Sequence, residues 1–266
     1  MCAEDRIVAS TLARPGKSGE CLARVSSRLP PGLGRPLALL LLPILAMLVP
    51  SSAAWPAGGA QIVDDSEVVD PGTCQLETWV TGFNGSGGGG YANATNTCTL
   101  SSLPRLEFGL QFQHYWYGQT STSDQLLGPA LKLNLIPEEN GVGLALEFNG
   151  GVDMRTGDLG LATLLLPVSI PLGDKARINL NAGWSYIGSA QFPNALFYGA
   201  QIESKIGWQD VSLMLEVFGR EPGFTGAQMG LRWRPNDGPL EFDLLAGTFF
   251  DTVNAKFFTV GITFRY

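Results

Sequence analysis

The chain has 266 residues, of which 45% are apolar and only 15% are charged, and its formal net charge is −7. The low charge excludes a disordered chain and departs from ordinary soluble domains, in which about 25% of residues are charged. The negative sign argues against nucleic acid as a partner, because nucleic-acid-binding proteins carry basic surfaces.

Residues 1–60 are predicted to be a secretory signal peptide. The apolar run Leu37–Val49 has 13 residues and contains a proline, so it is short for a membrane-spanning helix of about 20 residues. Basic residues precede the run and small residues follow it, as in signal peptides. We expect cleavage after Ala60, with cleavage after Ala54 as the alternative; an uncleaved anchor is the other interpretation.

Two cysteines, Cys74 and Cys98, remain after this cleavage. An exported protein meets an oxidising compartment, so a disulfide between them is expected. They lie at similar distances from the centre of the glycine-rich loop 84–90, which would place them opposite each other in a hairpin. Two buried free thiols are the alternative.

From residue 73 to the C-terminus, apolar and polar residues alternate. Between Phe258 and Tyr266, for example, every second residue is aromatic or branched aliphatic, and the residues between are Thr, Gly and Arg. Such alternation predicts strands with one apolar and one polar face. Twelve segments show it: 73–83, 91–100, 105–117, 127–136, 142–150, 161–171, 176–187, 195–206, 210–219, 226–234, 239–248 and 256–266.

The strand lengths and connections predict a barrel in the bacterial outer membrane. A tilted strand crosses a bilayer in about 9–11 residues, which is close to most of these segments. Short turns, such as 137–141 and 235–238, alternate with longer loops, as in outer-membrane barrels. Lipid tolerates no open sheet edge. We therefore predict an all-β fold, a closed antiparallel transmembrane β-barrel of 12 strands over residues 73–266, with both termini periplasmic.

Two prolines fit this prediction least. Pro167 and Pro171 lie in the sixth segment, and proline cannot donate a hydrogen bond to a ladder. We expect a bulge or an early strand end near residue 167.

The apolar face is predicted to point to lipid, because the polar face is rich in Gly, Asn, Gln, Ser and Thr, whereas a water-exposed surface has about 25–35% charged residues. Aromatic residues gather at strand ends, as in membrane-interface girdles: Tyr115, Trp116, Tyr117, Trp184, Tyr186, Trp233, Phe249, Phe250 and Tyr266. The aromatic end at Tyr266 resembles the signal recognised by the outer-membrane assembly machinery. The expected partners are thus the lipid bilayer and that machinery. A secreted soluble β-protein with its apolar face inward is the alternative.

The charged residues of the polar face are predicted to lie low in the lumen, near the short turns, with acids and bases nearly balanced. They are Glu107, Lys132, Glu147, Arg177, Glu203, Lys205, Glu216, Arg232, Arg234, Glu241, Asp243 and Arg265, with Glu77 placed higher. Residue-number sums across the short turns give three opposite-charge cross-strand pairs: Lys132–Glu147, Arg232–Asp243 and Arg234–Glu241.

This charge network has two interpretations. It is either a structural salt-bridge network that fills a narrow barrel or a charged constriction that selects solutes. The upper lumen is predicted to be neutral and polar, with Gln111, Gln113, Asn149, Ser185 and Thr259.

Residues 61–72, between the leader and the barrel, are acidic and have no periodic pattern. They are predicted to be a periplasmic N-terminal segment that hangs free. The alternative is a plug that tucks into the lumen.

No catalytic, metal or cofactor site is predicted. The one histidine, His114, falls on the apolar face, and the position two residues on is Trp116 rather than a nucleophile, which argues against an outer-membrane lipase. Asp153 and Asp158 lie in a glycine-rich loop, but their spacing matches a calcium site only weakly.

The stretch Val68-Val-Asp-Pro-Gly-Thr-Cys-Gln-Leu-Glu-Thr-Trp-Val80, followed by a glycine-rich turn and Cys98, resembles the opening of a family of small proteobacterial outer-membrane barrels. Those barrels are identified as transporters and are similar to the barrels of phenol meta-pathway degradation clusters. The resemblance implies uptake of small organic molecules and supplies no site residues. We therefore expect a channel or uptake protein for small solutes. The alternatives are a non-conducting structural or adhesion barrel and an outer-membrane hydrolase.

Overall fold

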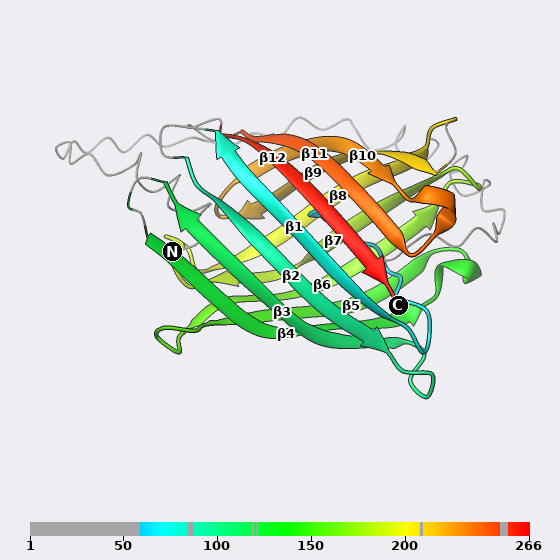
Figure 1. Ribbon diagram of the computed structural model, residues 1–266, viewed down its shortest axis with the longest axis horizontal. Coiled ribbons are helices and arrows are strands. Elements are labelled where there is room, and N and C mark those ends of the chain that lie inside the picture. Colours follow the sequence, from blue (N-terminus) through cyan, green and yellow to red (C-terminus); the bar gives the residue numbers. More distant parts are fainter. Residues whose placement is uncertain (1–58, 85–87, 119, 121, 208–209, 251–254) are drawn as a thin grey trace, which may run out of the picture.

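The computed structural model describes residues 59–84, 88–118, 120, 122–207, 210–250 and 255–266. The predicted signal peptide lies outside the described residues, apart from Gly59 and Ala60. In the described part, twelve antiparallel strands form a closed barrel (Figure 1). The strands are β1 (Cys74–Asn84), β2 (Gly90–Thr99), β3 (Leu106–Tyr117), β4 (Thr122–Ile136), β5 (Gly143–Asp153), β6 (Leu159–Pro171), β7 (Ala176–Ile187), β8 (Asn194–Lys205), β9 (Val211–Glu221), β10 (Thr225–Trp233), β11 (Leu240–Phe249) and β12 (Lys256–Arg265).

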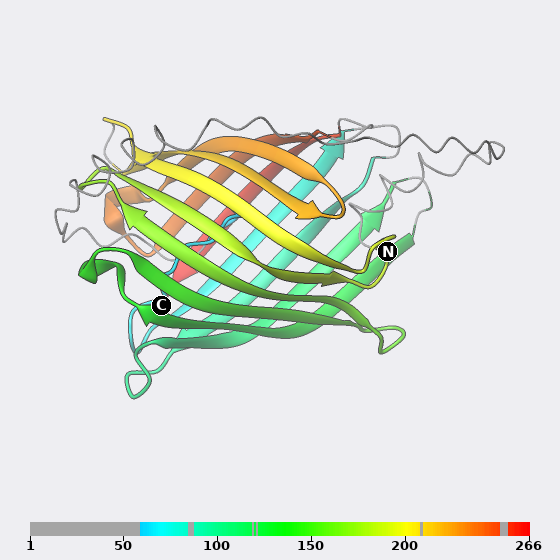
Figure 2. The same ribbon diagram turned by 180° about the vertical axis from the view of Figure 1, so that it is seen from behind.

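Each strand pairs with its neighbours in sequence, and β1 pairs with β12 to close the barrel. Figures 1 and 2 show β12, in red, between β1 and β11. Two single-turn 3-10 helices, η2 (Glu138–Asn140) and η3 (Pro235–Asp237), lie in short turns. The twelve predicted strands are confirmed; the largest boundary difference is at β4, which begins at Thr122. Among the described residues, no helix is long and apolar enough to cross a membrane.

The apolar faces of the strands point outward, as predicted. Leu110 is 60% exposed and Val217 is 54% exposed, whereas the polar residues that alternate with such side chains are enclosed, for example Gln201 at 1%. The barrel therefore presents an apolar band to lipid and a polar face to its lumen.

The two prolines of β6 are accommodated without the predicted bulge or early end at residue 167. Strand β6 continues to Pro171, and Pro167 pairs with Asn181 of β7. On the β5 side, the ladder is interrupted between the Leu144–Val168 and Glu147–Leu165 pairs, with no change of register across the interruption. The missing N–H of proline thus interrupts the pairing of β6 with β5 but not its pairing with β7.

The predicted disulfide is present. Cys74 and Cys98 are directly opposite in the β1–β2 ladder, and their Cα atoms are 4.0 Å apart. Cys74 also exchanges two backbone hydrogen bonds with Tyr266, of 2.8 and 2.9 Å. The disulfide therefore lies beside the seam where the first and last strands meet.

Only some of the predicted girdle aromatics face outward. Trp184, Trp233 and Phe250 are between 41% and 58% exposed, whereas Tyr115 and Phe249 are 8% and 5% exposed. Tyr115, Tyr117 and Phe249 belong to the enclosed face and not to a girdle. Alternation along β3 and β11 places them there, because they share the parity of the lumen-facing residues.

Candidate functional site

The segment before β1 runs inside the lumen, which overturns the prediction of a free periplasmic segment. Val63, Asp65 and Ser66 are fully enclosed. Figure 2 shows the cyan chain before β1 passing between the walls of the barrel. We call residues 59–72 the lumen segment.

Backbone N–H groups of the lumen segment donate to carboxylates of the barrel wall. Gly59 donates to Glu77 (2.5 Å), Ala60 to Asp243 (2.8 Å), Ile62 and Val63 to Glu216 (3.1 and 3.3 Å), and Val69 to Glu107 (2.8 Å). Such bonds to ionised acceptors are stronger than neutral ones. Four wall acids thus hold in place a segment that has no helix or strand of its own.

Three glycines of the wall leave the space that the segment occupies. A Cβ on Gly143 would come within 2.1 Å of Ser66 Oγ, one on Gly199 within 2.5 Å of Val63 Cγ2, and one on Gly261 within 2.5 Å of the Ala60 Cβ. Any larger residue would overlap the segment, so the wall sequence is matched to an occupied lumen.

The acidic side chains of the lumen segment bind two wall bases. Asp64 contacts Lys132 at 2.6 Å, and Asp65 contacts Arg177 at 2.9 Å, with all four groups largely enclosed. Lys132 does lie opposite Glu147 in the ladder, but its ion pairs go to Asp64 and Asp65.

A second charge cluster centres on Arg232. It lies opposite Asp243, with 2.9 Å between Nε and Oδ1, and it also contacts Glu241 at 3.1 Å. The third predicted pair does not form, because β10 ends at Trp233 and Arg234 donates from Nε to the Gly238 carbonyl (2.8 Å). Glu241 instead reaches Arg265 at 3.4 Å.

Enclosed acids outnumber enclosed bases, which corrects the predicted balance. Lys205 is exposed at the end of β8, and Arg234 and Arg265 are only half-buried, because long basic side chains at strand ends reach water. Among the described residues, eight acids and four bases are buried: Asp65, Glu77, Glu107, Glu147, Glu203, Glu216, Glu241 and Asp243 against Lys132, Arg177, Arg220 and Arg232.

Sequence reasoning missed Arg220, which lies at the long-loop end of β9. Its guanidinium donates to Ser185 Oγ (3.0 Å) and to the carbonyls of Phe192 (2.7 Å) and Pro193 (2.5 Å). Alternation would have placed Arg220 inward with Phe218 had the predicted strand not ended at residue 219.

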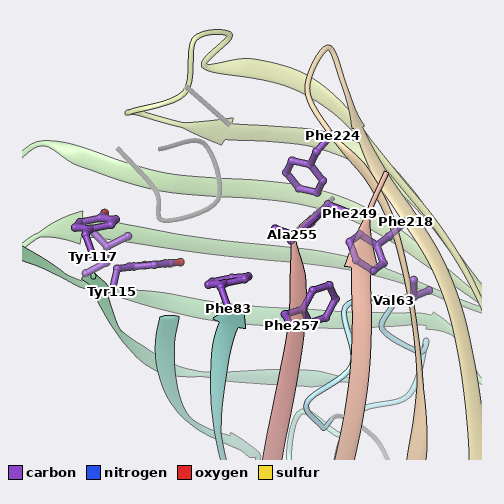
Figure 3. Close-up of a cluster of buried hydrophobic side chains, with 10 residues drawn as sticks. Val63, Phe83, Tyr115, Tyr117, Phe218, Phe224, Phe249, Ala255 and Phe257 are labelled. Carbon is purple, nitrogen blue, oxygen red and sulfur yellow. The ribbon is translucent and has the colours of Figure 1, made fainter. Parts of the chain in front are cut away.

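The upper lumen is not purely polar. Gln111, Gln113, Ser185 and Thr259 are enclosed there as expected, and Asn149 is half-buried. A cluster of aromatic rings shares this region (Figure 3), with Phe249 centred 5.2 Å from both Phe224 and Phe257. Val63 of the lumen segment packs against this cluster.

Two cavities adjoin these groups. One of about 250 Å³ lies between the lumen segment and the wall, beside Asp64, Lys132 and Glu147. The other, of about 300 Å³, lies at the long-loop end and is lined by Tyr115, Asp124 and Arg155, among others.

His114 and the loop residue Asp153 both take part in local structural contacts. His114 is half-buried and stacks on Trp116, with ring centres 6.0 Å apart. Asp153 accepts hydrogen bonds from the backbone N–H groups of Arg155 (2.8 Å) and Thr156 (3.0 Å). It therefore stabilises the turn in which it lies. Within the described ranges, no group of three or more His, Cys, Asp or Glu side chains could hold a metal ion.

Solved structures of outer-membrane channels are similar to this barrel. The COG4313 outer membrane channel from Pseudomonas putida F1 has a TM-score of 0.54 at 13% identity, over 76% of this chain and 98% of that chain. KdgM porin in complex with disordered oligogalacturonate has a TM-score of 0.52 at 7% identity, over 71% and 98%. NanC porin has a TM-score of 0.51 at 7% identity, over 71% and 98%. Identities this low show the fold alone, that of bacterial outer-membrane barrels surrounded by lipid; these neighbours are channels and porins rather than enzymes.

The sequence itself matches one family model. No curated protein matches, and the resemblance to the phenol meta-pathway barrels stays a prediction. The model described as uncharacterised conserved protein UCP029691 matches residues 45–266. The chain therefore belongs to the family of uncharacterised conserved proteins UCP029691.

Proposed function

We propose that the protein is an outer-membrane channel for small solutes, closed in this conformation by the lumen segment. The observation that carries the proposal is how the lumen is filled. Residues 59–69 occupy the part of the lumen that the charged wall side chains line, and hydrogen bonds and ion pairs hold them there. A filling held by separable polar contacts, each worth about 0.5–3 kcal/mol, can leave the lumen without unfolding the barrel.

Two features support small organic solutes as the cargo. The aromatic cluster around Phe249 offers an apolar surface inside the upper lumen, and the opening motif resembles barrels that take up organic molecules. The excess of enclosed acids favours neutral or cationic solutes over anions. KdgM was solved with an oligogalacturonate, and the acid excess makes a polyanion of that kind an unfavourable solute for this lumen.

The charges around Arg232 form the proposed constriction. Arg232 contacts Glu241 at 3.1 Å and Asp243 at 2.9 Å. It also donates a hydrogen bond to Gln61 of the lumen segment. Replacing Arg232 and Asp243 together by alanine in a barrel without its lumen segment should raise the conductance. An unchanged conductance would assign the pair a structural role only.

Planar-bilayer recording tests the channel itself. The wild-type protein should be mostly silent, and a variant that lacks residues 59–69 should give discrete conductance steps. Folding of both proteins is checked by the heat-dependent shift in electrophoretic mobility typical of folded barrels. A folded but silent deletion variant would overturn the proposal and favour the non-conducting structural barrel.

A further inference from the structure

We propose that the cavity of about 250 Å³ beside the lumen segment is a binding site for a small organic cation that carries amino groups. The site lies in the closed protein, between residues 59–64 and the inner walls of β1 to β6 and β8. It needs no open channel, although it names the solute class that the proposed channel would admit.

The charges that line the cavity are almost all negative. Asp64, Glu77, Glu107 and Glu147 face it, and Lys132 is the single basic residue among the described lining residues. Lys132 is already bound to Asp64 at 2.6 Å. A guest with positive charge would therefore meet carboxyl groups that accept hydrogen bonds but have no basic partner among the other lining residues, whereas an anion would be repelled.

Unpartnered hydrogen-bonding atoms point to the same class of guest. Gln75 Oε1, Thr97 Oγ1 and Glu147 Oε2 belong to lining residues that are between 1% and 8% exposed, and none of these atoms has a hydrogen-bond partner. The amide oxygen of Gln75 can only accept hydrogen bonds, and the same holds for the oxygens of Glu147 when it is ionised. Buried acceptors without donors are costly, so a guest that brings several N–H donors would satisfy them.

The size and the remaining lining favour an organic amine over a metal ion. A water molecule occupies about 30 Å³ in the liquid, so the cavity holds a guest of several heavy atoms. Trp79, Leu161, Leu165 and Phe197 also line it. They offer an apolar surface to a carbon skeleton, and the aromatic rings among them attract cations.

Three probes with a four-carbon chain test whether the charge or the shape of the guest decides binding. They are 1,4-diaminobutane, the neutral 1,4-butanediol and the anionic succinate. Isothermal titration calorimetry on the detergent-solubilised, closed protein should show saturable binding of the diamine and no binding of butanediol or succinate. Equal binding of butanediol would overturn the assignment to cations, and so would absence of diamine binding.

Variants locate the site. Glu147→Gln should weaken diamine binding about tenfold, because it removes a charge-assisted hydrogen bond, and Gln75→Leu should weaken it several-fold. Asp174→Asn, at an exposed turn position, makes the same charge change outside the cavity and should leave the affinity unchanged. If Glu147→Gln folds and binds the diamine as tightly as wild type, the cavity is not the site.

The diamine site and the channel can be refuted independently of each other. Diamine binding to a protein whose deletion variant stays silent would keep the site and remove the channel. A conducting deletion variant of a protein that binds no diamine would do the reverse.

Discussion

At the scale of single residues, the wall glycines determine where the lumen segment can lie. Gly199 of β8 faces Val63 so closely that an added Cβ would be 2.5 Å from Val63 Cγ2. Overpacking of this kind costs about 1–3 kcal/mol. One methyl group in the wall therefore opposes docking of the whole segment.

We predict that Gly199→Ala releases the lumen segment. Hydrogen exchange of the amides in residues 59–69 should speed up by about 5- to 150-fold, the equivalent of that overpacking cost. Gly82→Ala is the matched control, because a Cβ on Gly82 meets nothing within 4 Å. Unchanged exchange in Gly199→Ala would mean that the segment repacks without loss.

Arg177 joins a buried acid of the lumen segment to a buried acid of the wall. It contacts Asp65 at 2.9 Å and Glu203 at 3.1 Å, and its side chain is fully buried. Arg177→Met should destabilise the folded protein by about 3–5 kcal/mol, because it removes the shorter ion pair of two buried carboxylates. Asp65 then keeps only Lys132, and Glu203 keeps only Arg232, each at 3.9 Å.

Urea titration followed by electrophoretic mobility measures that loss. Arg155→Met is the control, because the Arg155 side chain is 77% exposed and its contact to Asp124 is 3.7 Å long, so its effect should be near zero. Similar midpoints for both variants would show that water already solvates the acids around Arg177.

Sequence alternation predicted the lumen-facing charges and one of their ion pairs, Arg232–Asp243, but not the other partners. The register sums place Lys132 opposite Glu147 and Arg232 opposite Asp243, since a hairpin fixes both by counting. The residue-number sum gave the wrong partner for Arg234, because β10 ends at Trp233 and the register does not continue beyond it. Residue-number sums could not predict the Asp64–Lys132 contact, because Asp64 lies outside the strands and has no register with β4.

At the scale of elements, the lumen segment meets the turn between β4 and β5. The Glu138 N–H donates to Glu67 at 2.9 Å, and Glu138 also lies 3.6 Å from Arg177. Burial raises the pKa of Glu138 to about 7; Arg177 opposes this increase, and Asp65 and Glu67 add to it. Burial likewise raises the pKa of Glu67.

We predict that docking of the lumen segment weakens as the pH rises. Asp65 and Glu67 of the docked segment are among the groups that raise the pKa of Glu138, so the docked state binds the Glu138 proton more tightly than the undocked state. The contribution of Glu138 to docking is therefore fully present below its ordinary pKa of 4.5 and is progressively lost as the pH rises to about 7.

Hydrogen exchange of the segment at pH 5 and pH 8, corrected for intrinsic rates, measures this dependence. Glu138→Gln should flatten it, and Glu139→Gln, at the exposed neighbouring position, should not. A dependence that survives in Glu138→Gln would assign it to other groups.

The contacts at the start of the lumen segment also predict where the mature chain begins. Gly59 and Ala60 donate to Glu77 and Asp243, and Ala60 is 6% exposed. Cleavage after Ala60 would remove both donors, so we expect cleavage after Ala54. N-terminal sequencing of the outer-membrane form should read Trp55 first, and a first residue of Gln61 would contradict this.

At the scale of the whole molecule, the lumen is an acid-rich tube. The wall contributes seven buried acids and four buried bases among the described residues, once Asp65 of the lumen segment is set aside. The strand count, closure and facing of the barrel follow from local alternation and were predictable. The acid excess was not, because it depends on which basic side chains reach water at the rims.

We predict that the barrel without residues 59–69 selects cations. In a potassium chloride gradient, its reversal potential should have the sign of potassium permeation, and Glu77→Gln with Glu107→Gln should shift it toward zero, since the field of lining carboxylates sets the preference. An anion-selective current would show that the bases dominate the narrowest part.

The lumen segment immediately precedes β1, and β1 is joined to β12, the last strand to be synthesised. When β1 and β12 pair, the barrel closes around whatever already lies in the lumen. A lumen segment that already lies inside at that moment is enclosed without having to enter through the rim, so the order of assembly decides whether a new barrel starts filled or empty.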